Sequence, residues 1–196
     1  MKIERNENGE LLLFFTKREE WRDWLFDNHQ KHAMAWLVNA KKASGKPAIP
    51  YNEAVEEALC VNWIDSVNKR FDKDHSLQRY SPRRKNSQYS QANVERLRWL
   101  DTKDLIHPEY KDQLRTLIEE EYSFPHDILA EIEKDTVAWK HYMSFPEGYK
   151  RIRIAYIDSA RNRPDEFARR LAHFIQKSRK NILLSGYGGI EKYYYP

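Results

Sequence analysis

Short apolar runs and alternating stretches before residue 90 predict the strands of a small sheet. Residues 11–15 are all apolar, and residues 33–38 alternate large with small or apolar side chains. Both patterns are typical of buried strands. Residues 63–72 and 75–82 alternate less regularly, and the polar pair Lys73-Asp74 between them favours a tight turn. The pattern therefore predicts two further strands joined by that turn.

Two helices are predicted between these strands. Thr16-Lys17-Arg18-Glu19 fits a capping box, so we expect a helix to begin at Thr16. Trp21, Trp24 and Leu25 then share one face of this helix, because they are three and four residues apart. A second helix is expected after Pro50, with acidic side chains in its first turns and a narrow apolar face toward the sheet.

From Ser90 onward, apolar residues recur at helical spacing, which predicts helices throughout this part of the chain. Prolines, which the first turn of a helix tolerates, stand near the expected helix starts at Pro108, Pro125, Pro146 and Pro164. Residues 181–196 lack any helical period and are rich in glycine and tyrosine. We expect this tail to be either a flexible terminus or an aromatic strap.

Together these elements predict an α+β fold. Residues 1–90 are expected to form a domain with a small mixed or antiparallel sheet and two or three helices. Residues 91–180 are expected to form an all-helical part packed on that domain, followed by the tail at residues 181–196.

The composition indicates a folded chain in a reducing compartment. Hydrophobic residues make up 40% of the 196 residues, which supplies enough apolar material for a core. No apolar run approaches the length of a membrane span, and the polar opening lacks the apolar core of a signal peptide. Cys60 is the single cysteine, so no internal disulfide forms. We therefore expect a cytoplasmic protein without membrane insertion.

The net charge of +4 is distributed in blocks. Residues 61–100 carry a net charge of +5, residues 101–135 carry −7 and residues 136–180 carry +7. Such blocks can attract an anion or a nucleic acid. They can equally be solvent-exposed helix faces whose opposite charges pair with one another. Exposure to solvent is the commoner situation of charged residues.

Few residues outside the centre of the chain suggest chemistry. Cys60 lies toward the end of an apolar helix with no histidine placed beside it, so we interpret it as a buried structural cysteine. His29 and His32 share a helical spacing, but no nearby cysteine or acidic residue completes a metal site. Neither a metal nor a cofactor is expected. Sequential carboxylates such as Glu56 and Glu57 face different directions on a helix and are interpreted as surface charges.

The most informative stretch is residues 60–93. Between Ser76 and Val94 it carries four positive charges and no acidic residue, and hydroxyl and aromatic side chains accompany the arginines. Arginine binds carboxylate or phosphate through two parallel hydrogen bonds, and the combination is typical of an anion or polar-ligand pocket. The candidate ligand-binding residues are Trp63, Asp65, Gln78, Arg79, Arg83, Ser87 and Ser90.

Two interpretations of these residues carry equal weight. In the first, Arg79 and Arg83 hold an anionic group, Asp65 orients one of them and Trp63 forms a wall. In the second, the same arginines and hydroxyl groups bind Asp65 and lock the corner between strand and helix, without any ligand.

The same stretch carries a family resemblance. Residues 51–60 (Tyr-Asn-Glu-Ala-Val-Glu-Glu-Ala-Leu-Cys), 63–66 (Trp-Ile-Asp-Ser) and 78–83 (Gln-Arg-Tyr-Ser-Pro-Arg) resemble the YdeI/OmpD-associated, or bacteriocin-protection, family. The resemblance extends over residues 11–175. It implies a bacterial protein with a role in withstanding bacteriocins or envelope stress, and an association with an outer-membrane porin. It transfers no catalytic residue to this chain.

We therefore expect a cytoplasmic stress or bacteriocin-protection protein with an anion-accepting pocket. For this protein a binding role is favoured over an enzymatic one. One alternative is a nucleic-acid-binding protein that uses the basic blocks 76–98 and 150–180. Another is a small hydrolase or transferase that uses Asp65 or Cys60, although no base, nucleophile and orienting group are seen together. The small anionic ligand is the expected partner, and a protein partner stays open.

Overall fold

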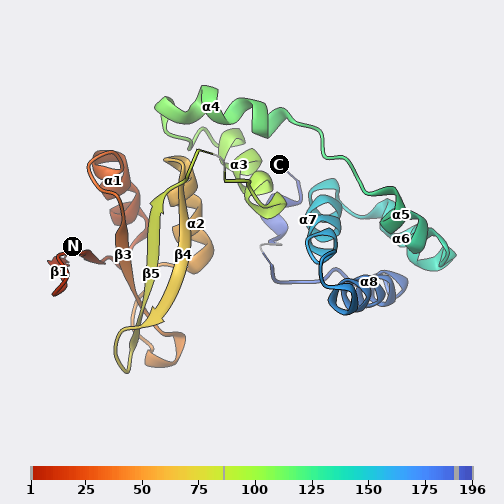
Figure 1. Cartoon of the computed structure of the whole chain (residues 1–196), viewed down its shortest axis with the longest axis horizontal. Helices are drawn as coiled ribbons and strands as arrows, with labels where there is room; N and C mark the ends of the chain where they lie inside the picture. Colours follow the sequence, from red (N-terminus) through yellow and green to blue (C-terminus); the bar gives the residue numbers. More distant parts are fainter. Residues whose placement is uncertain (1, 86, 188–189, 196) are drawn as a thin grey trace. The chain divides into compact units, whose positions relative to one another are not determined.

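The computed structural model describes residues 2–85, 87–187 and 190–195, and the chain divides into two compact units (Figure 1). Unit 1 comprises Met1–Gln88 and Asp104–Leu114. Unit 2 comprises Tyr89–Lys103 and Arg115–Pro196. The chain therefore leaves unit 1 at Tyr89, returns to it at Asp104 and leaves it again after Leu114.

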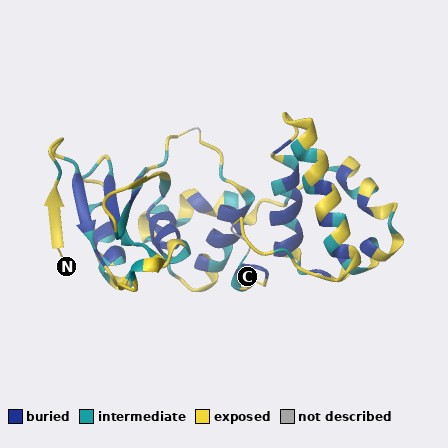
Figure 2. Ribbon diagram, turned by 90° about the horizontal axis from the view of Figure 1, so that it is seen from below, coloured by how far each residue is buried: buried dark blue, intermediate teal, exposed yellow. Residues whose placement is uncertain are grey.

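Unit 1 contains a five-stranded mixed sheet in the order β1-β2-β3-β5-β4. The strands are β1 (Lys2–Arg5), β2 (Leu11–Phe14), β3 (Ala35–Ala40), β4 (Trp63–Arg70) and β5 (His75–Pro82). β2 and β3 pair in parallel, and the other neighbours are antiparallel. The α+β class is confirmed, and so is the β4–β5 hairpin. β1 was not predicted because it is an exposed, polar edge strand (Figure 2).

Two helices cover one face of this sheet. They are α1 (Arg18–Asn28) and α2 (Tyr51–Cys60), and a 3₁₀ turn, η1, occupies Lys42–Ser44. The indole Nε1 of Trp21 donates to the carbonyl oxygen of Ala54 at 3.0 Å, and the Trp21 ring packs against Tyr80 of β5 at 5.2 Å between centroids. α1 begins at Arg18, two residues later than the predicted start at Thr16. The acidic side chain that accepts hydrogen bonds from the backbone N–H groups of Thr16 and Lys17 is that of Glu20 rather than Glu19.

The prediction that Glu56 and Glu57 are surface charges is wrong. Both side chains are fully buried, and two arginines of α1 neutralise them. Arg18 bonds both carboxylates, and Nε of Arg22 lies 2.8 Å from Oε2 of Glu57. Burial alone would lower the pKa of Arg18, but the carboxylates of Glu57 and Glu56 raise it above its ordinary value. These ion pairs join α1 to α2.

Unit 2 is built mainly from helices around an aromatic and aliphatic core. The helices after residue 90 are α3 (Gln91–Thr102), α4 (Pro108–Glu119), α5 (His126–Glu133), α6 (Thr136–Ser144), α7 (Glu147–Asp158) and α8 (Pro164–Arg179). α4 begins in unit 1 and ends in unit 2. Residues 182–185 are not helical, so the later part of the chain is mainly rather than wholly helical. No helix among the described residues has the length and apolar character that crossing a bilayer requires.

The described part of the tail forms an aromatic strap within unit 2. Tyr193, in the 3₁₀ turn η2 (Glu191–Tyr193), is fully buried, and Tyr194 packs against Tyr149 of α7. The approach is close because Gly148 has no side chain: a Cβ there would lie 2.5 Å from the carbonyl oxygen of Tyr193. Residues 188, 189 and 196, which also belong to the predicted tail, lie outside the described residues.

Candidate functional site

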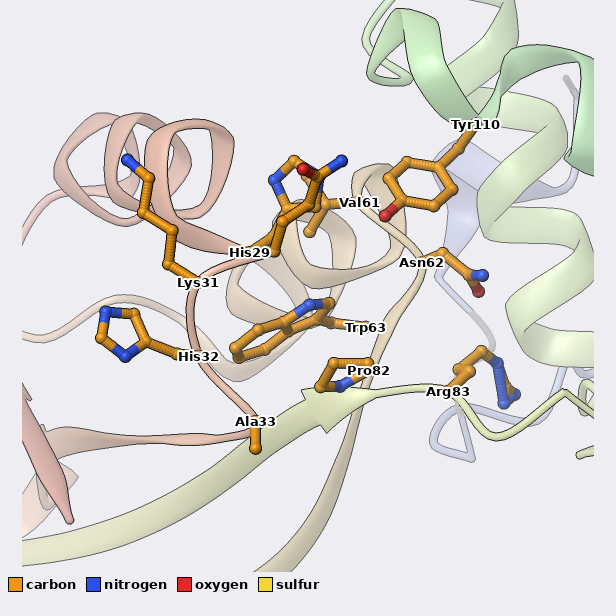
Figure 3. Close-up of a pocket in the computed structure, with 11 residues that line it drawn as sticks. His29, Lys31, His32, Ala33, Val61, Asn62, Trp63, Pro82, Arg83 and Tyr110 are labelled. Carbon is orange, nitrogen blue, oxygen red and sulfur yellow. The ribbon is translucent and has the colours of Figure 1, made fainter.

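Unit 1 contains an open cleft of about 540 Å³ (Figure 3). Four segments that are distant in sequence meet there: the end of α1, the α2–β4 connection, the end of β5 and the start of α4. The lining residues are His29, Gln30, Lys31, His32, Ala33, Val61, Asn62, Trp63, Pro82, Arg83 and Tyr110. The volume lies within the range of pockets that bind small molecules.

Trp63 forms the floor of the cleft. The residue is only 1% exposed, and its side chain lies between His32 on one side and Asn62 and Arg83 on the other (Figure 3). Trp24 of α1 holds it edge to face, with 6.1 Å between the ring centroids, and also stacks on His32 at 5.6 Å. The floor is therefore a rigid aromatic surface rather than a mobile side chain.

The backbone between α2 and β4 sets the position of Arg83. Asn62 has a left-handed conformation with φ of 56°, which turns the chain sharply from α2 into β4. Its carbonyl oxygen accepts a hydrogen bond from the backbone N–H of Arg83 at 3.0 Å. The end of β5 is thus fixed beside the cleft.

The lining of the cleft is basic. It contains Lys31, Arg83 and two histidines, His29 and His32, but no aspartate or glutamate. Partial burial lowers the pKa of His32 below its ordinary value, and the positive charges of Arg5 and Lys31 lower it further. His32 is therefore neutral at pH 7 and gains charge as the solution becomes acidic. The arrangement favours an anion over a cation.

Two of the residues predicted to bind a ligand line this cleft, namely Trp63 and Arg83. The guanidinium of Arg83 lies over the loop that follows β5, where Nη1 donates to Ser87 Oγ at 3.4 Å and Nη2 to the carbonyl oxygen of Gln88 at 3.3 Å. These are long hydrogen bonds, which an incoming anion can replace at little cost. Ser87 therefore lies beside Arg83, although it does not itself line the cleft.

Asp65 and Gln78 lie together but do not line the cleft. The carboxylate of Asp65 accepts hydrogen bonds from the Tyr51 hydroxyl at 2.8 Å and from Nε2 of Gln78 at 3.4 Å. Gln78 in turn accepts a hydrogen bond from Nδ2 of Asn68 at 2.9 Å. This polar network ties the start of α2 to β4 and β5, and the partners of Asp65 here are not arginines.

Arg79 lies on the other face of the sheet. Successive residues of a strand point to opposite faces, and Tyr80 packs beneath α1, so its neighbour Arg79 points away from α1. Arg79 pairs with Trp36 of β3, whose indole donates to Glu10 at 3.1 Å. A hydrogen bond from Asn6 lowers the pKa of Glu10, and Trp36, Lys69 and Arg79 lower it further.

Ser90 is the N-cap of α3, where its hydroxyl accepts a hydrogen bond from the backbone N–H of Asn93 at 3.3 Å. It belongs to unit 2, whereas Ser87 belongs to unit 1. The structure thus places Trp63 and Arg83 in the cleft and Ser87 beside Arg83, and it pairs Asp65 with Gln78. Arg79 lies on the other face of the sheet, and Ser90 lies at the start of α3. The part that each plays in ligand binding stays a prediction.

Cys60 is fully buried at the end of α2. Burial raises the pKa of its thiol far above the ordinary value, and the negative charge of Glu57 raises it further. A thiol without access to solvent or to its thiolate form does not act as a nucleophile. The structure agrees with the interpretation of Cys60 as a structural residue.

Three residues of unit 1 are grouped as metal ligands would be. One ligand atom from each of His29, His107 and Glu109 lies within 4.8 Å of the other two. The sequence predicts no metal at His29, because no acidic residue is near it in the chain. Glu109 is 80 residues away and is brought to His29 by the fold. Tyr110 of the cleft was missed for the same reason, and no local signal in the sequence identifies either residue.

Two family models match the chain. Residues 13–113 match the family described as "Domain of unknown function (DUF8412)", and residues 121–181 match the family described as "Bacteriocin-protection, YdeI or OmpD-Associated". No curated protein and no solved structure matches the chain. The resemblance to the YdeI/OmpD-associated family is confirmed over residues 121–181, a narrower range than 11–175. The motifs at residues 51–83 lie within the segment matched by the domain of unknown function.

Proposed function

The chain belongs to the family described as a domain of unknown function (DUF8412), and we propose that unit 1 is a binding module for a small anion such as a phosphate or carboxylate. The observation that carries this proposal is the lining of the cleft, which combines Arg83, Lys31 and His32 with no acidic residue. Glu109 does not line the cleft, and its carboxylate lies against His29 and Gln30. An anion placed there gains favourable interactions without displacing a carboxylate.

The residues of the cleft have separate roles in this proposal. Arg83 supplies the main charged hydrogen bonds, because guanidinium groups bind phosphate and carboxylate strongly. Its contacts to Ser87 Oγ and to the carbonyl oxygen of Gln88 are long, at 3.4 and 3.3 Å. Lys31 adds positive charge from the segment that follows α1, and His32 adds more once it is protonated in acidic solution. Trp63 closes the floor and excludes water beneath the ligand, which strengthens the electrostatic interactions above it.

A role in bacteriocin protection is the second part of the proposal. It is supported by the match of residues 121–181 to the YdeI/OmpD-associated family. We propose that this role depends on occupancy of the cleft in unit 1, in a bacterial cytoplasmic protein that acts in stress. Cells that carry the Arg83→Ala variant should then survive bacteriocin treatment no better than cells that lack the protein, while the wild-type chain restores survival.

Nucleic-acid binding has less support. Many cations of the block 150–180 already form ion pairs inside unit 2, among them Arg151 with Glu95 at 2.6 Å and Arg170 with Glu166 at 2.6 Å. Cations that are neutralised by carboxylates release few counterions from a nucleic acid and therefore add little affinity. Hydrolase or transferase chemistry has less support too, because Cys60 is buried and Asp65 is engaged with Tyr51.

The proposal is tested by calorimetric titration of the full chain with sulfate and with phenyl phosphate. We expect saturable binding that weakens by about tenfold or more in Arg83→Ala, since a hydrogen bond to a charged group contributes about 1.5–3 kcal/mol. Arg84→Ala is the matched control, because Arg84 is exposed and does not line the cleft. The proposal is wrong if neither probe binds, or if Arg84→Ala weakens binding as much as Arg83→Ala.

A further inference from the structure

His29 faces a carboxylate in a way that requires a proton or a metal ion between them. Nδ1 of His29 lies 2.9 Å from the carbonyl oxygen of Leu25. A carbonyl oxygen only accepts, so Nδ1 carries the hydrogen of the ring. Nε2 of the neutral ring then has a lone pair, yet it lies 3.3 Å from Oε2 of Glu109. Two lone pairs repel at this distance, so either a proton or a metal ion lies between the two atoms.

A third ligand side chain stands beside this pair. The ring of His107 lies 5.0 Å from the ring of His29, centroid to centroid, and the ligand atoms of the three residues are within 4.8 Å of one another. A proton shared between His29 and Glu109 would not involve His107, whereas a metal ion would bind all three side chains. We propose that His29, His107 and Glu109 bind a divalent transition-metal ion such as Zn²⁺.

The types of ligand agree with this class of ion. Two imidazoles and one carboxylate, with a fourth position left for water or another ligand, form a common open zinc site. Magnesium and calcium prefer ligands that are all oxygen. Metal–ligand bonds of about 2.0–2.1 Å place the ligand atoms of a tetrahedral site roughly 3.4 Å apart. The 3.3 Å between His29 and Glu109 already meets this separation, whereas the ligand atom of His107, within 4.8 Å of the other two, would move closer to them on binding.

The outer partners of these ligands are also in place. The carbonyl oxygen of Leu25 fixes the ring of His29, and Nε2 of Gln30 donates to both oxygens of Glu109, at 2.6 and 2.7 Å. Such second partners orient metal ligands and are a regular part of metal sites. The backbone N–H of His107 donates to the carbonyl oxygen of Cys60 at 3.0 Å, which holds the third ligand against the end of α2.

An ion can reach the site from solvent. The side chain of His29 is only 5% exposed, but that of Glu109 is 43% exposed. The ring of His107 accepts a long hydrogen bond, from the backbone N–H of Glu109 to Nδ1 at 3.3 Å, which a bound ion can replace at little cost. Because His29 also lines the cleft, a bound ion would add positive charge there, but metal binding itself requires no anion.

The test is titration of the full, chelator-treated chain with Zn²⁺ and with Co²⁺, followed by calorimetry and by the visible absorption of cobalt. We expect one ion per chain. Glu109→Gln should weaken binding by at least about tenfold, because the loss of even an outer partner costs about 10–100-fold. Glu109→Gln is the deciding variant, because glutamine keeps the size of the side chain and can still bond Gln30 on an exposed surface. His107→Ala should weaken binding as strongly.

Two controls accompany these variants. Asp112→Asn changes an acidic residue on the same helix α4, and His126→Ala removes an exposed histidine of α5. Both should bind the ion as the wild-type chain does. The absence of saturable binding to the wild-type chain would overturn the proposal. Unchanged binding in Glu109→Gln and His107→Ala would overturn it too, and a lowered melting temperature alone in these variants would identify a proton-mediated ion pair instead.

Discussion

Glu57 joins α1 to α2, and its substitution should destabilise unit 1 strongly. Its carboxylate is fully buried and bonds both Arg18 and Arg22. Breaking a buried ion pair costs about 3–5 kcal/mol, because a charge is left without a partner. In Glu57→Gln, Arg18 keeps its contact with Glu56 at 2.8 Å, so only Arg22 loses its sole carboxylate partner among the described residues.

The arginine side chains also retain some access to water, with 21% of Arg18 and 23% of Arg22 exposed. Water therefore compensates part of the loss. We expect a cost near the lower limit, about 3 kcal/mol. With a urea dependence of about 2–3 kcal/mol per molar, the unfolding midpoint of unit 1 should fall by about 1 M.

The assay must report on unit 1 alone, because a chain of two compact units need not unfold in one step. Pulsed hydrogen exchange in increasing urea, read by mass spectrometry on peptides from β3 and β5, meets this requirement. Glu53→Gln is the matched control. Glu53 lies one turn earlier on α2 and makes no ion pair within the described residues. The urea midpoint of Glu53→Gln should therefore equal that of the wild-type chain within experimental error. Equal midpoints for the two variants would refute the assignment of a stabilising role to the buried pair.

Three further predictions follow from burial and charge. Gly148→Ala should destabilise unit 2 by about 1–3 kcal/mol, because the new Cβ overlaps the backbone of Tyr193. Limited proteolysis should then release the tail more readily, and an unchanged cleavage rate would contradict the packing of the tail against α7. Cys60 should not react with a thiol reagent until urea unfolds the chain, because its thiol is buried and its pKa is raised; rapid labelling of the native protein would show otherwise. Sulfate binding should strengthen as the pH falls from neutral through the lowered pKa of His32, because the imidazole is neutral above that pKa and positively charged below it. The same pH dependence in His32→Ala would disprove its role.

Most elements of unit 1 could be predicted because their signals are local. The apolar run of β2, the alternation in β3 and the turn between β4 and β5 are each contained in fewer than twenty residues. β1 carries no such signal, because an exposed edge strand needs no apolar face. The burial of Glu56 and Glu57 was missed because it depends on arginines contributed by another helix.

The candidate site could be predicted only in part. Trp63 and Arg83 were identified by their composition alone, and both line the cleft. From the sequence, Gln78 and Arg79 are predicted to line one pocket. Successive residues of a strand point to opposite faces of the sheet, so these two side chains cannot both face the same pocket. Tyr110 and Glu109 could not be placed, because only the folded chain brings α4 to the end of α1.

The central claim, that the cleft of unit 1 binds a small anion through Arg83, is tested most directly by nuclear magnetic resonance of the ¹⁵N-labelled full chain during titration with phenyl phosphate. The side-chain Nε–H of Arg83 and the indole N–H of Trp63 should shift together and saturate with one affinity. The signals of Arg79, on the other face of the sheet, and of Trp139, in unit 2, should stay in place. Shifts at Arg79 without any at Arg83, or shifts confined to unit 2, would contradict the account.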